Sequence, residues 1–149
     1  IGQDPEHGVG LGLLWCLDAT KTGDTTESAK IWSFDKIQRT MSTVAIHDDL
    51  LYITDFAGNF YCLDAETGKL EWQHNLAYRV WGSPFVADGK VYIGDTSGRL
   101  TIFKTGRTKV EPTVVNLNSD ICTTPAAANG TLYVACHKYL YAVRAPAKK

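Results

Sequence analysis

The chain alternates short apolar runs with clusters of turn-forming residues, and the same landmarks recur along it. Leu51-Tyr52-Ile53 returns as Val91-Tyr92-Ile93 and again as Leu132-Tyr133-Val134, at shifts of 40 and 41 residues. Ser83-Pro84 returns as Thr124-Pro125, also at a shift of 41 residues. Because independent landmarks share one period, the sequence is an array of repeats.

Each repeat predicts short strands joined by tight turns. Asp88-Gly89 and Asn129-Gly130 stand between apolar runs, and both dipeptides tolerate the positive φ angles of two-residue hairpin turns. Asp48-Asp49 occupies the same point in an earlier repeat and is a weaker turn former. Four short strands in a period of about 40 residues correspond to one β-propeller blade.

Several strands are apolar on both faces, for example over Leu50–Ile53 and Phe60–Leu63. A sheet with one face in water would alternate apolar and polar residues instead. Blades that stack face to face bury both surfaces, which explains the missing alternation. We therefore expect an all-β chain of four-stranded antiparallel propeller blades, with the rings of Trp32 and Trp72 packed between blades.

The repeats predict a single propeller segment over 1–149 with about three blades in it. The expected divisions are a partial blade over 12–41, blades over 42–82 and 83–123, a partial blade over 124–144 and a tail over 145–149. About three blades do not close a ring of the usual four to eight, so an apolar face is left at each end. We expect the other blades of a longer parent, or further copies, to cover these faces. The isolated chain should therefore self-associate.

The charge balance limits the classes of binding partner that the chain can have. Lys and Arg number 15 against 16 Asp and Glu, which gives a net charge of −1. This balance argues against nucleic acid and anionic membranes as partners, and no apolar run approaches the roughly 20 residues that span a bilayer. The chain begins at Ile1 without Met or a signal peptide, which favours a processed or excised product.

The sequence offers little catalytic chemistry. The four cysteines, Cys16, Cys62, Cys122 and Cys136, form no CxxC pair. Cys16 and Cys62 occupy matching positions in apolar strands, so we favour buried free thiols over a disulfide for these two. No Ser or Cys stands in a recognisable nucleophile elbow. We therefore predict no catalytic residue, no metal ligand and no cofactor-binding residue, and we lean against an enzyme.

One set of equivalent positions lies just before the first strand of each repeat. Its members are Arg39, Arg79 and Asp120 and, two positions later in each repeat, Met41, Trp81 and Cys122. Equivalent positions in a propeller form a ring about its axis, so we expect this set at one mouth of the central channel. Because Arg and Trp are enriched in interaction hot spots, Arg39, Arg79, Trp81 and Asp120 are a candidate protein-binding site. In the alternative interpretation Trp81 belongs to the core and the charges only solvate loops.

The segment Tyr61–Trp72 resembles the repeat signature of the quinoprotein-like (PQQ-like) β-propellers. Ser83–Tyr92 is similar to the next part of that repeat, and the resemblance covers nearly all of residues 12–144. The opening segment over 2–8, followed by Trp15–Asp18, resembles the later part of bacterial propellers of the outer-membrane protein assembly lipoprotein type.

The resemblance implies two functions of different classes. The first is a non-catalytic scaffold of the periplasm or cell envelope that presents a rigid surface to protein partners. The second is a fragment of a quinone-dependent dehydrogenase, a class that holds its cofactor near two adjacent cysteines and a calcium ion on a carboxylate and an Asn. A third option is an excised or engineered repeat unit that self-assembles without an activity of its own.

The residues favour the scaffold over the dehydrogenase. The sequence contains no adjacent cysteine pair. The carboxylates that stand out, Asp55, Asp64, Asp88 and Asp95, all lie in predicted turns, where Asp caps the backbone. We therefore expect no complete cofactor site within this chain.

Overall fold

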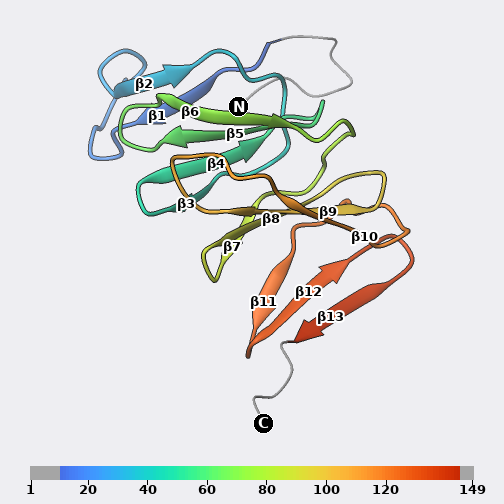
Figure 1. The fold of residues 1–149 in the computed structure, drawn as a ribbon. Coiled ribbons are helices and arrows are strands. Elements are labelled where there is room, and N and C mark those ends of the chain that lie inside the picture. Colours follow the sequence, from blue (N-terminus) through green and yellow to red (C-terminus); the bar gives the residue numbers. More distant parts are fainter. Residues whose placement is uncertain (1–10, 145–149) are drawn as a thin grey trace.

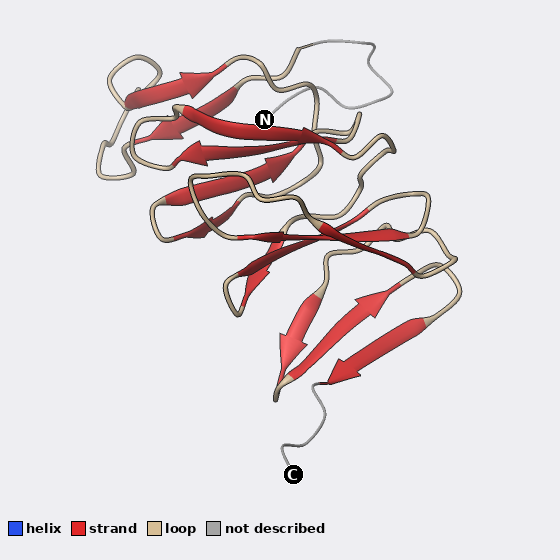
Figure 2. Cartoon of the chain, in the orientation of Figure 1, coloured by secondary structure: helices blue, strands red, loops and turns tan. Residues whose placement is uncertain are grey.

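The computed structural model describes residues 11–144, and the regular structure of this part is entirely β-strand (Figures 1 and 2). Thirteen strands form four antiparallel sheets in that range, and the sheets follow one another in chain order. Within it, no helix has the length and apolarity needed to cross a membrane. The opening segment over 2–8 and the tail over 145–149, which entered the sequence predictions, lie outside the described residues.

Neighbouring strands in each sheet are also neighbours in the chain, so every sheet is a simple meander. Sheet 1 contains β1 (Leu14–Leu17) and β2 (Lys30–Phe34). Sheet 2 contains β3 (Ala45–His47), β4 (Leu50–Thr54), β5 (Asn59–Asp64) and β6 (Leu70–Asn75). Sheet 3 contains β7 (Phe85–Ala87), β8 (Lys90–Gly94), β9 (Arg99–Lys104) and β10 (Thr113–Asn116). Sheet 4 contains β11 (Ala126–Ala128), β12 (Thr131–Ala135) and β13 (Leu140–Arg144).

Sheets 2 and 3 are complete four-stranded antiparallel blades, and the two outer sheets are parts of blades. By repeat position, β1 and β2 correspond to β5 and β6, the third and fourth strands of a blade, whereas β11 to β13 correspond to β7 to β9. The successive sheets face one another as radial blades do (Figure 1). The predicted all-β partial propeller is thus confirmed, and the predicted limits of the individual repeats stay a prediction.

The first turn of each repeat adopts the backbone conformation that the sequence predicts. Both residues of Asp88-Gly89 have positive φ, at 51° and 64°, and those of Asn129-Gly130 have φ of 51° and 70°. Asp48-Asp49 adopts φ of 48° and 58° as well, although its second residue carries a Cβ atom. A weaker turn former therefore makes the same turn, because the strands on either side impose it.

The apolar residues of sheet 2 contribute to two cores, one on each face. Toward sheet 1, Leu51 and Tyr61 pack with Phe34 and Ile37. Toward sheet 3, a second cluster joins side chains of both sheets: Tyr52, Phe60 and Trp72 from sheet 2, and Val91, Ile93 and Phe103 from sheet 3. We call the contact of sheets 1 and 2 junction 1, that of sheets 2 and 3 junction 2, and that of sheets 3 and 4 junction 3. Burial on both faces explains why these strands do not alternate apolar and polar residues.

Trp32 and Trp72 pack between blades, as the sequence predicts. The Trp32 indole N–H donates to the carbonyl oxygen of Ala65 at 3.1 Å, and the Trp72 indole N–H donates to that of Gly106 at 2.9 Å. Gly68 makes room for Trp32, since a Cβ atom there would lie 2.5 Å from the ring. Each tryptophan thus links the outermost strand of one blade to the next blade.

The cysteine prediction is right for Cys62 and wrong in part for Cys16. All four cysteines are free thiols. Cys62 is buried in junction 2, and this burial raises the pKa of its thiol to about 12. Cys16 is only half-buried. It lies on β1, which pairs with β2 alone within the described residues, whereas Cys62 lies on β5 between β4 and β6.

Candidate functional site

The structure anchors the three equivalent residues of the candidate site in one way. Each carbonyl oxygen accepts a hydrogen bond from the turn after the second strand of the sheet that its connection enters. The pairs are Arg39 with the Phe56 N–H at 2.9 Å, Arg79 with the Thr96 N–H at 3.0 Å and Asp120 with the His137 N–H at 2.9 Å. The repeat therefore fixes the backbone at all three positions, and only the side chains differ.

Arg39, Arg79 and Trp81 meet around one aromatic ring, that of Phe56. The guanidinium carbons of Arg39 and Arg79 lie 5.4 and 5.5 Å from the Phe56 ring centroid. The Trp81 ring stands edge-on to Phe56 with 5.1 Å between centroids. Phe56 itself is buried, whereas Trp81 is 44% exposed. Trp81 is therefore not a core residue, and we call these four residues the Phe56 cluster.

The third repeat offers different chemistry at the same positions. Asp120 and Cys122 are both exposed, and Cys122 lines a hollow of about 220 Å³ together with Cys136 and His137. Met41, the equivalent of Trp81 and Cys122 in the first repeat, is exposed as well. Arg39 and Arg79 thus place two cations around the Phe56 ring, whereas the third repeat presents the carboxylate of Asp120 and the thiol of Cys122 at the equivalent positions.

Sequence reasoning missed Phe56, the residue that organises the cluster. The period of 40 residues aligns it with Thr96 and then with His137 at 41, so no common side chain marks the position. The available signal was its place in a predicted turn, two residues after the last residue of β4. A large apolar residue in such a turn needs a partner, and the connection from the preceding sheet supplies it.

Hydroxyl groups link the successive connections next to this cluster. The Thr43 N–H and hydroxyl both donate to the Ser83 Oγ, at 2.9 and 3.0 Å. The Ser83 N–H in turn donates to the Thr124 Oγ1 at 2.9 Å. Gly82 fits against the next connection because a Cβ atom there would lie 2.4 Å from the Thr123 carbonyl oxygen. These contacts fix the position of each connection, and of the candidate residues on it, relative to the next connection.

The two most buried carboxylates stabilise turns. Asp55 accepts hydrogen bonds from the Asn59 backbone and side-chain amides, both at 2.9 Å, and from the Tyr61 hydroxyl at 3.1 Å. Asp95 accepts from the Arg99 backbone N–H and pairs with the Arg99 guanidinium, both at 3.2 Å. Burial, and then the neighbouring Asp55 charge, raise the pKa of Tyr61 above its ordinary value. Both carboxylates are therefore committed to the fold.

The other two carboxylates singled out from the sequence also lie at turns. Asp64 accepts from the Thr67 backbone and hydroxyl at 2.9 and 2.8 Å and pairs with Arg107 at 2.7 Å. The Thr67 and Arg107 hydrogen bonds hold the pKa of Asp64 at about 2. Asp88 pairs with Lys90 at 2.9 Å.

The residues present do not fit a quinone and calcium site. The carboxylates that would have to bind calcium already interact with residues of their own turns. Asp55, Asp64 and Asp95 accept hydrogen bonds there, and Asp88 forms an ion pair with Lys90. In the described part of the chain, no group of three His, Cys, Asp or Glu side chains is arranged to hold a metal ion. The sequence lacks the adjacent cysteine pair that its resemblance to the dehydrogenases calls for.

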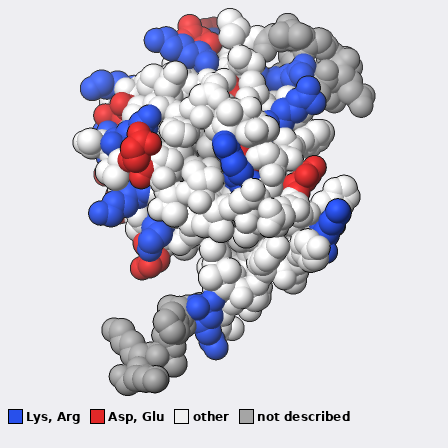
Figure 3. Space-filling model, turned by 45° about the vertical axis from the view of Figure 1, so that its right-hand side comes forward, with Lys and Arg blue, Asp and Glu red and all other residues white. Residues whose placement is uncertain are grey.

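Charge is dispersed on the surface. On the face shown in Figure 3, basic and acidic side chains are interspersed among broad uncharged areas. No patch of one sign dominates that face, which agrees with a net charge of −1.

The blades, the repeat signature and the indole contacts define a PQQ-like β-propeller. The model of the family described as outer membrane protein assembly factor BamB matches residues 21–146, and the chain belongs to this family.

Known relatives include both classes that the resemblance implies. BamB of Shewanella oneidensis is 26% identical over 98 residues, which are 63% of this chain and 25% of that protein. The dehydrogenase subunit of the alcohol dehydrogenase (quinone) of Gluconobacter oxydans is 32% identical over 94 residues, 56% of this chain and 12% of that protein. The crystal structure of BamB from Moraxella catarrhalis matches with a TM-score of 0.73 and 24% identity, over 95% of this chain and 44% of that one. The chain thus spans 25% or less of the curated relatives it matches.

Proposed function

We propose that this chain is part of a non-catalytic β-propeller scaffold of a bacterial cell envelope, and that it binds a protein partner through the Phe56 cluster. The observation that carries the proposal is the geometry of Trp81. Trp81 is 44% exposed, yet its ring packs edge-on against the ring of the buried Phe56. In the propeller this cluster and Asp120 lie at one mouth of the central channel.

The cluster has the composition and the rigidity of an interaction hot spot. Trp and Arg are enriched in such sites, and rigid anchors lose little conformational entropy on binding. Both backbone polar groups of Phe56 are hydrogen-bonded. Its N–H donates to the Arg39 carbonyl oxygen, and its carbonyl oxygen accepts from the Val80 N–H at 3.3 Å. Asp120 adds the opposite charge one repeat away, which favours one orientation of a partner with complementary charges.

Family membership supports the class of partner and the compartment. The name of the family is outer membrane protein assembly factor, and its matched member from Shewanella oneidensis carries the same name. The partner is accordingly another protein of outer-membrane assembly, and the compartment is the periplasmic side of that membrane.

A double substitution tests the proposal. Arg79→Ala with Trp81→Ala removes one cation and the exposed ring while the Phe56 backbone hydrogen bonds remain. We expect the yield of cross-links from position 41 to outer-membrane assembly proteins, measured in cells by mass spectrometry, to fall at least about tenfold.

Val114→Ala is the matched control, because Val114 is exposed on the outermost strand of sheet 3, away from the cluster. This variant should cross-link as the unchanged protein does. Thermal unfolding of the double variant should remain cooperative. Undiminished cross-linking after both substitutions at the cluster would refute the proposed site.

The dehydrogenase alternative rests on the Gluconobacter relative. Adding pyrroloquinoline quinone with Ca²⁺ to the chain, followed by gel filtration and an absorption spectrum, separates the two classes. We expect the quinone to elute free. A stoichiometric bound chromophore would overturn the scaffold proposal.

Exposed apolar side chains at both ends favour covering neighbours. Leu17 and Ile31 are exposed on sheet 1, and Tyr133 and Leu140 are exposed on the face of sheet 4 that points away from sheet 3. We propose that further blades of a longer parent or further copies of the chain cover these faces. The isolated chain, including an excised or engineered form of it, then self-associates. A compact, stable monomer in sedimentation velocity would contradict this proposal.

A further inference from the structure

Junctions 2 and 3 have equivalent walls. In junction 2 a row of paired residues on sheet 2 faces a row on sheet 3: Tyr52, Cys62 and Trp72 face Val86, Val91 and Phe103. The pairing of the strands places an equivalent row on each wall of junction 3. These rows are Tyr92, Ile102 and Thr113 on sheet 3, and Ala127, Leu132 and Val143 on sheet 4.

The contents of the two junctions differ in size. Trp72 is replaced by Thr113, Phe103 by Val143 and Val86 by Ala127, so that two aromatic rings are lost and every one of these three changes is to a smaller side chain. In junction 2 the two rings contact each other, with 5.5 Å between the centroids of Trp72 and Phe103. Thr113 and Val143 are too short to fill that space.

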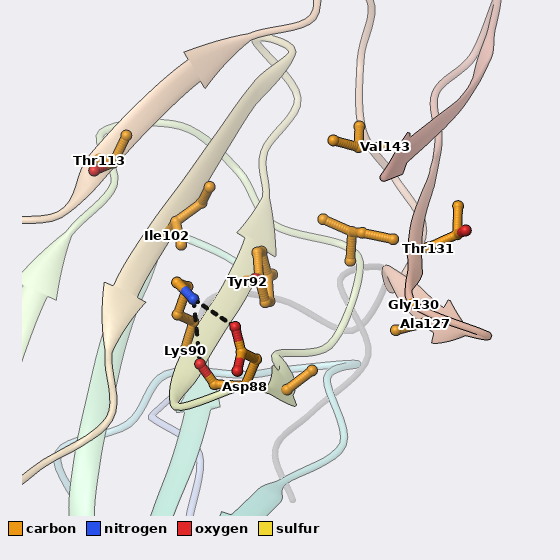
Figure 4. A pocket seen from close by; sticks show the side chains of 11 residues that line it. Asp88, Lys90, Tyr92, Ile102, Thr113, Ala127, Gly130, Thr131 and Val143 are labelled. Atoms are coloured by element: carbon orange, nitrogen blue, oxygen red, sulfur yellow. Dashed lines mark hydrogen bonds and ion pairs between the residues drawn. The ribbon is translucent and has the colours of Figure 1, made fainter. Parts of the chain in front are cut away.

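A pocket of about 530 Å³ opens in junction 3. All six residues of the two facing rows line it, and Figure 4 shows Tyr92, Ile102 and Thr113 on one side with Ala127 and Val143 on the other. Its volume lies within the range of pockets that hold small molecules. Most of its lining is apolar, and apolar cavities in proteins accept aromatic molecules.

We propose that this pocket binds a neutral, planar aromatic small molecule of two fused rings, the size of an indole. The size follows from the repeat, because an indole ring occupies the equivalent space in junction 2 and Trp32 packs in a corresponding way in junction 1.

The charge of the ligand follows from the rim. Lys90 lines the pocket, and its ammonium group donates to the carboxylate of Asp88 at 2.9 Å (Figure 4). This ion pair leaves the rim neutral, so it offers no counter-ion to a charged ligand. Thr113 lines the pocket at the position equivalent to Trp72 in junction 2. Its hydroxyl group forms one hydrogen bond with the ligand, as donor or as acceptor.

Indole itself is the probe. Titration of the full chain with indole should shift the methyl NMR signals of Ile102, Leu132 and Val143 saturably. The methyl signals of Ile53, which is buried in junction 1, should not move. Thr113→Trp places the missing ring in the pocket, and we expect it to weaken indole binding at least about tenfold and to raise the melting temperature.

Val114→Trp is the matched control, since it adds the same ring to the same strand at a residue that does not line the pocket. It should leave indole binding unchanged. Should Thr113→Trp fail to fold, Val143→Phe restores the other missing ring and should weaken binding in the same direction. The proposal is overturned if indole causes no saturable shift, if the filled variant binds as well as the unchanged chain, or if the control loses binding equally.

Discussion

Sheets 3 and 4 carry the same strand sequence motif in two different environments. On the third strand of each sheet, Leu100 and Leu140 occupy the same repeat position, 40 residues apart. Leu100 is 5% exposed and Leu140 is 69% exposed. Sheet 3 has a sheet on each side, whereas sheet 4 has a neighbour on one side only within the described residues. The third strand of this repeat therefore carries an apolar residue that only an adjacent sheet can bury.

The largest expected effect comes from truncating these two leucines. Leu100→Ala removes buried methyl groups and should lower the free energy of unfolding by about 2–5 kcal/mol. Leu140→Ala changes a side chain that is exposed in the single chain, and at a protein concentration low enough to keep copies dissociated it should change the free energy of unfolding by no more than about 0.5 kcal/mol. Urea unfolding at one fixed protein concentration measures both, because association would shift apparent stability.

Equal losses in the two variants would break the comparison between sheets 3 and 4. They would mean that Leu140 is covered in solution by another chain or by a residue outside 11–144. Repeating the measurement over a range of protein concentrations then identifies a second chain, since only that source depends on concentration.

A smaller contrast is expected between two turn glycines. Gly98 in sheet 3 has φ of 85°, and a Cβ atom there would lie 2.8 Å from the Ser119 amide nitrogen of the next connection. Gly130 in sheet 4 has φ of 70° with open space around it. Alanine at either position should cost about 1–3 kcal/mol in backbone strain. Gly98→Ala should cost about 1 kcal/mol more, because the clash adds to the strain.

Thermal unfolding of both alanine variants, with Gly106→Ala as a third turn glycine in open space, measures this contrast. If Gly98→Ala and Gly130→Ala prove equally stable, the connection near Ser119 yields to the added methyl group, and the packing of sheet 3 against the next sheet is looser than its distances indicate.

The smallest effect concerns pH and is confined to junction 2. His74 packs edge-on against Phe103 at 5.1 Å. Burial, and then the positive charge of Lys109, lower the pKa of His74 below 6.5; Glu111 opposes this shift and Arg99 adds to it. Because the unfolded chain binds the proton more tightly, stability is full above pH 6.5 and falls as the pH drops below that value.

Unfolding measured at pH 7.5 and pH 5.5, about one unit on either side of the usual histidine pKa, tests this effect. His74→Gln should flatten the pH dependence over this window without changing junction 3, where Val115 occupies the equivalent position. An unchanged slope in the variant would assign the pH dependence to other groups.

The repeat signal predicted the blades and the tryptophan contacts, because both depend on residues that recur. It also placed Arg39, Arg79 and Trp81 at equivalent points before the first strand. It did not predict the Phe56 cluster, since that contact joins side chains of two repeats around a residue that the other repeats lack.

The pocket of junction 3 escaped prediction for a related reason. Thr113 and Val143 are ordinary strand residues by themselves. Only the strand pairing shows that both face one space, and that the previous junction fills that space with Trp72 and Phe103. The partial exposure of Cys16 likewise depended on a missing neighbour and not on its own segment.

The hydroxyl contacts from Thr43 to Ser83 and from Ser83 to Thr124 span 40 and 41 residues. Each repeat accepts from the one before it and donates to the one after it, so duplicating or deleting a whole unit re-forms the same bond between new neighbours. The chain can therefore gain or lose whole repeats while the fold survives.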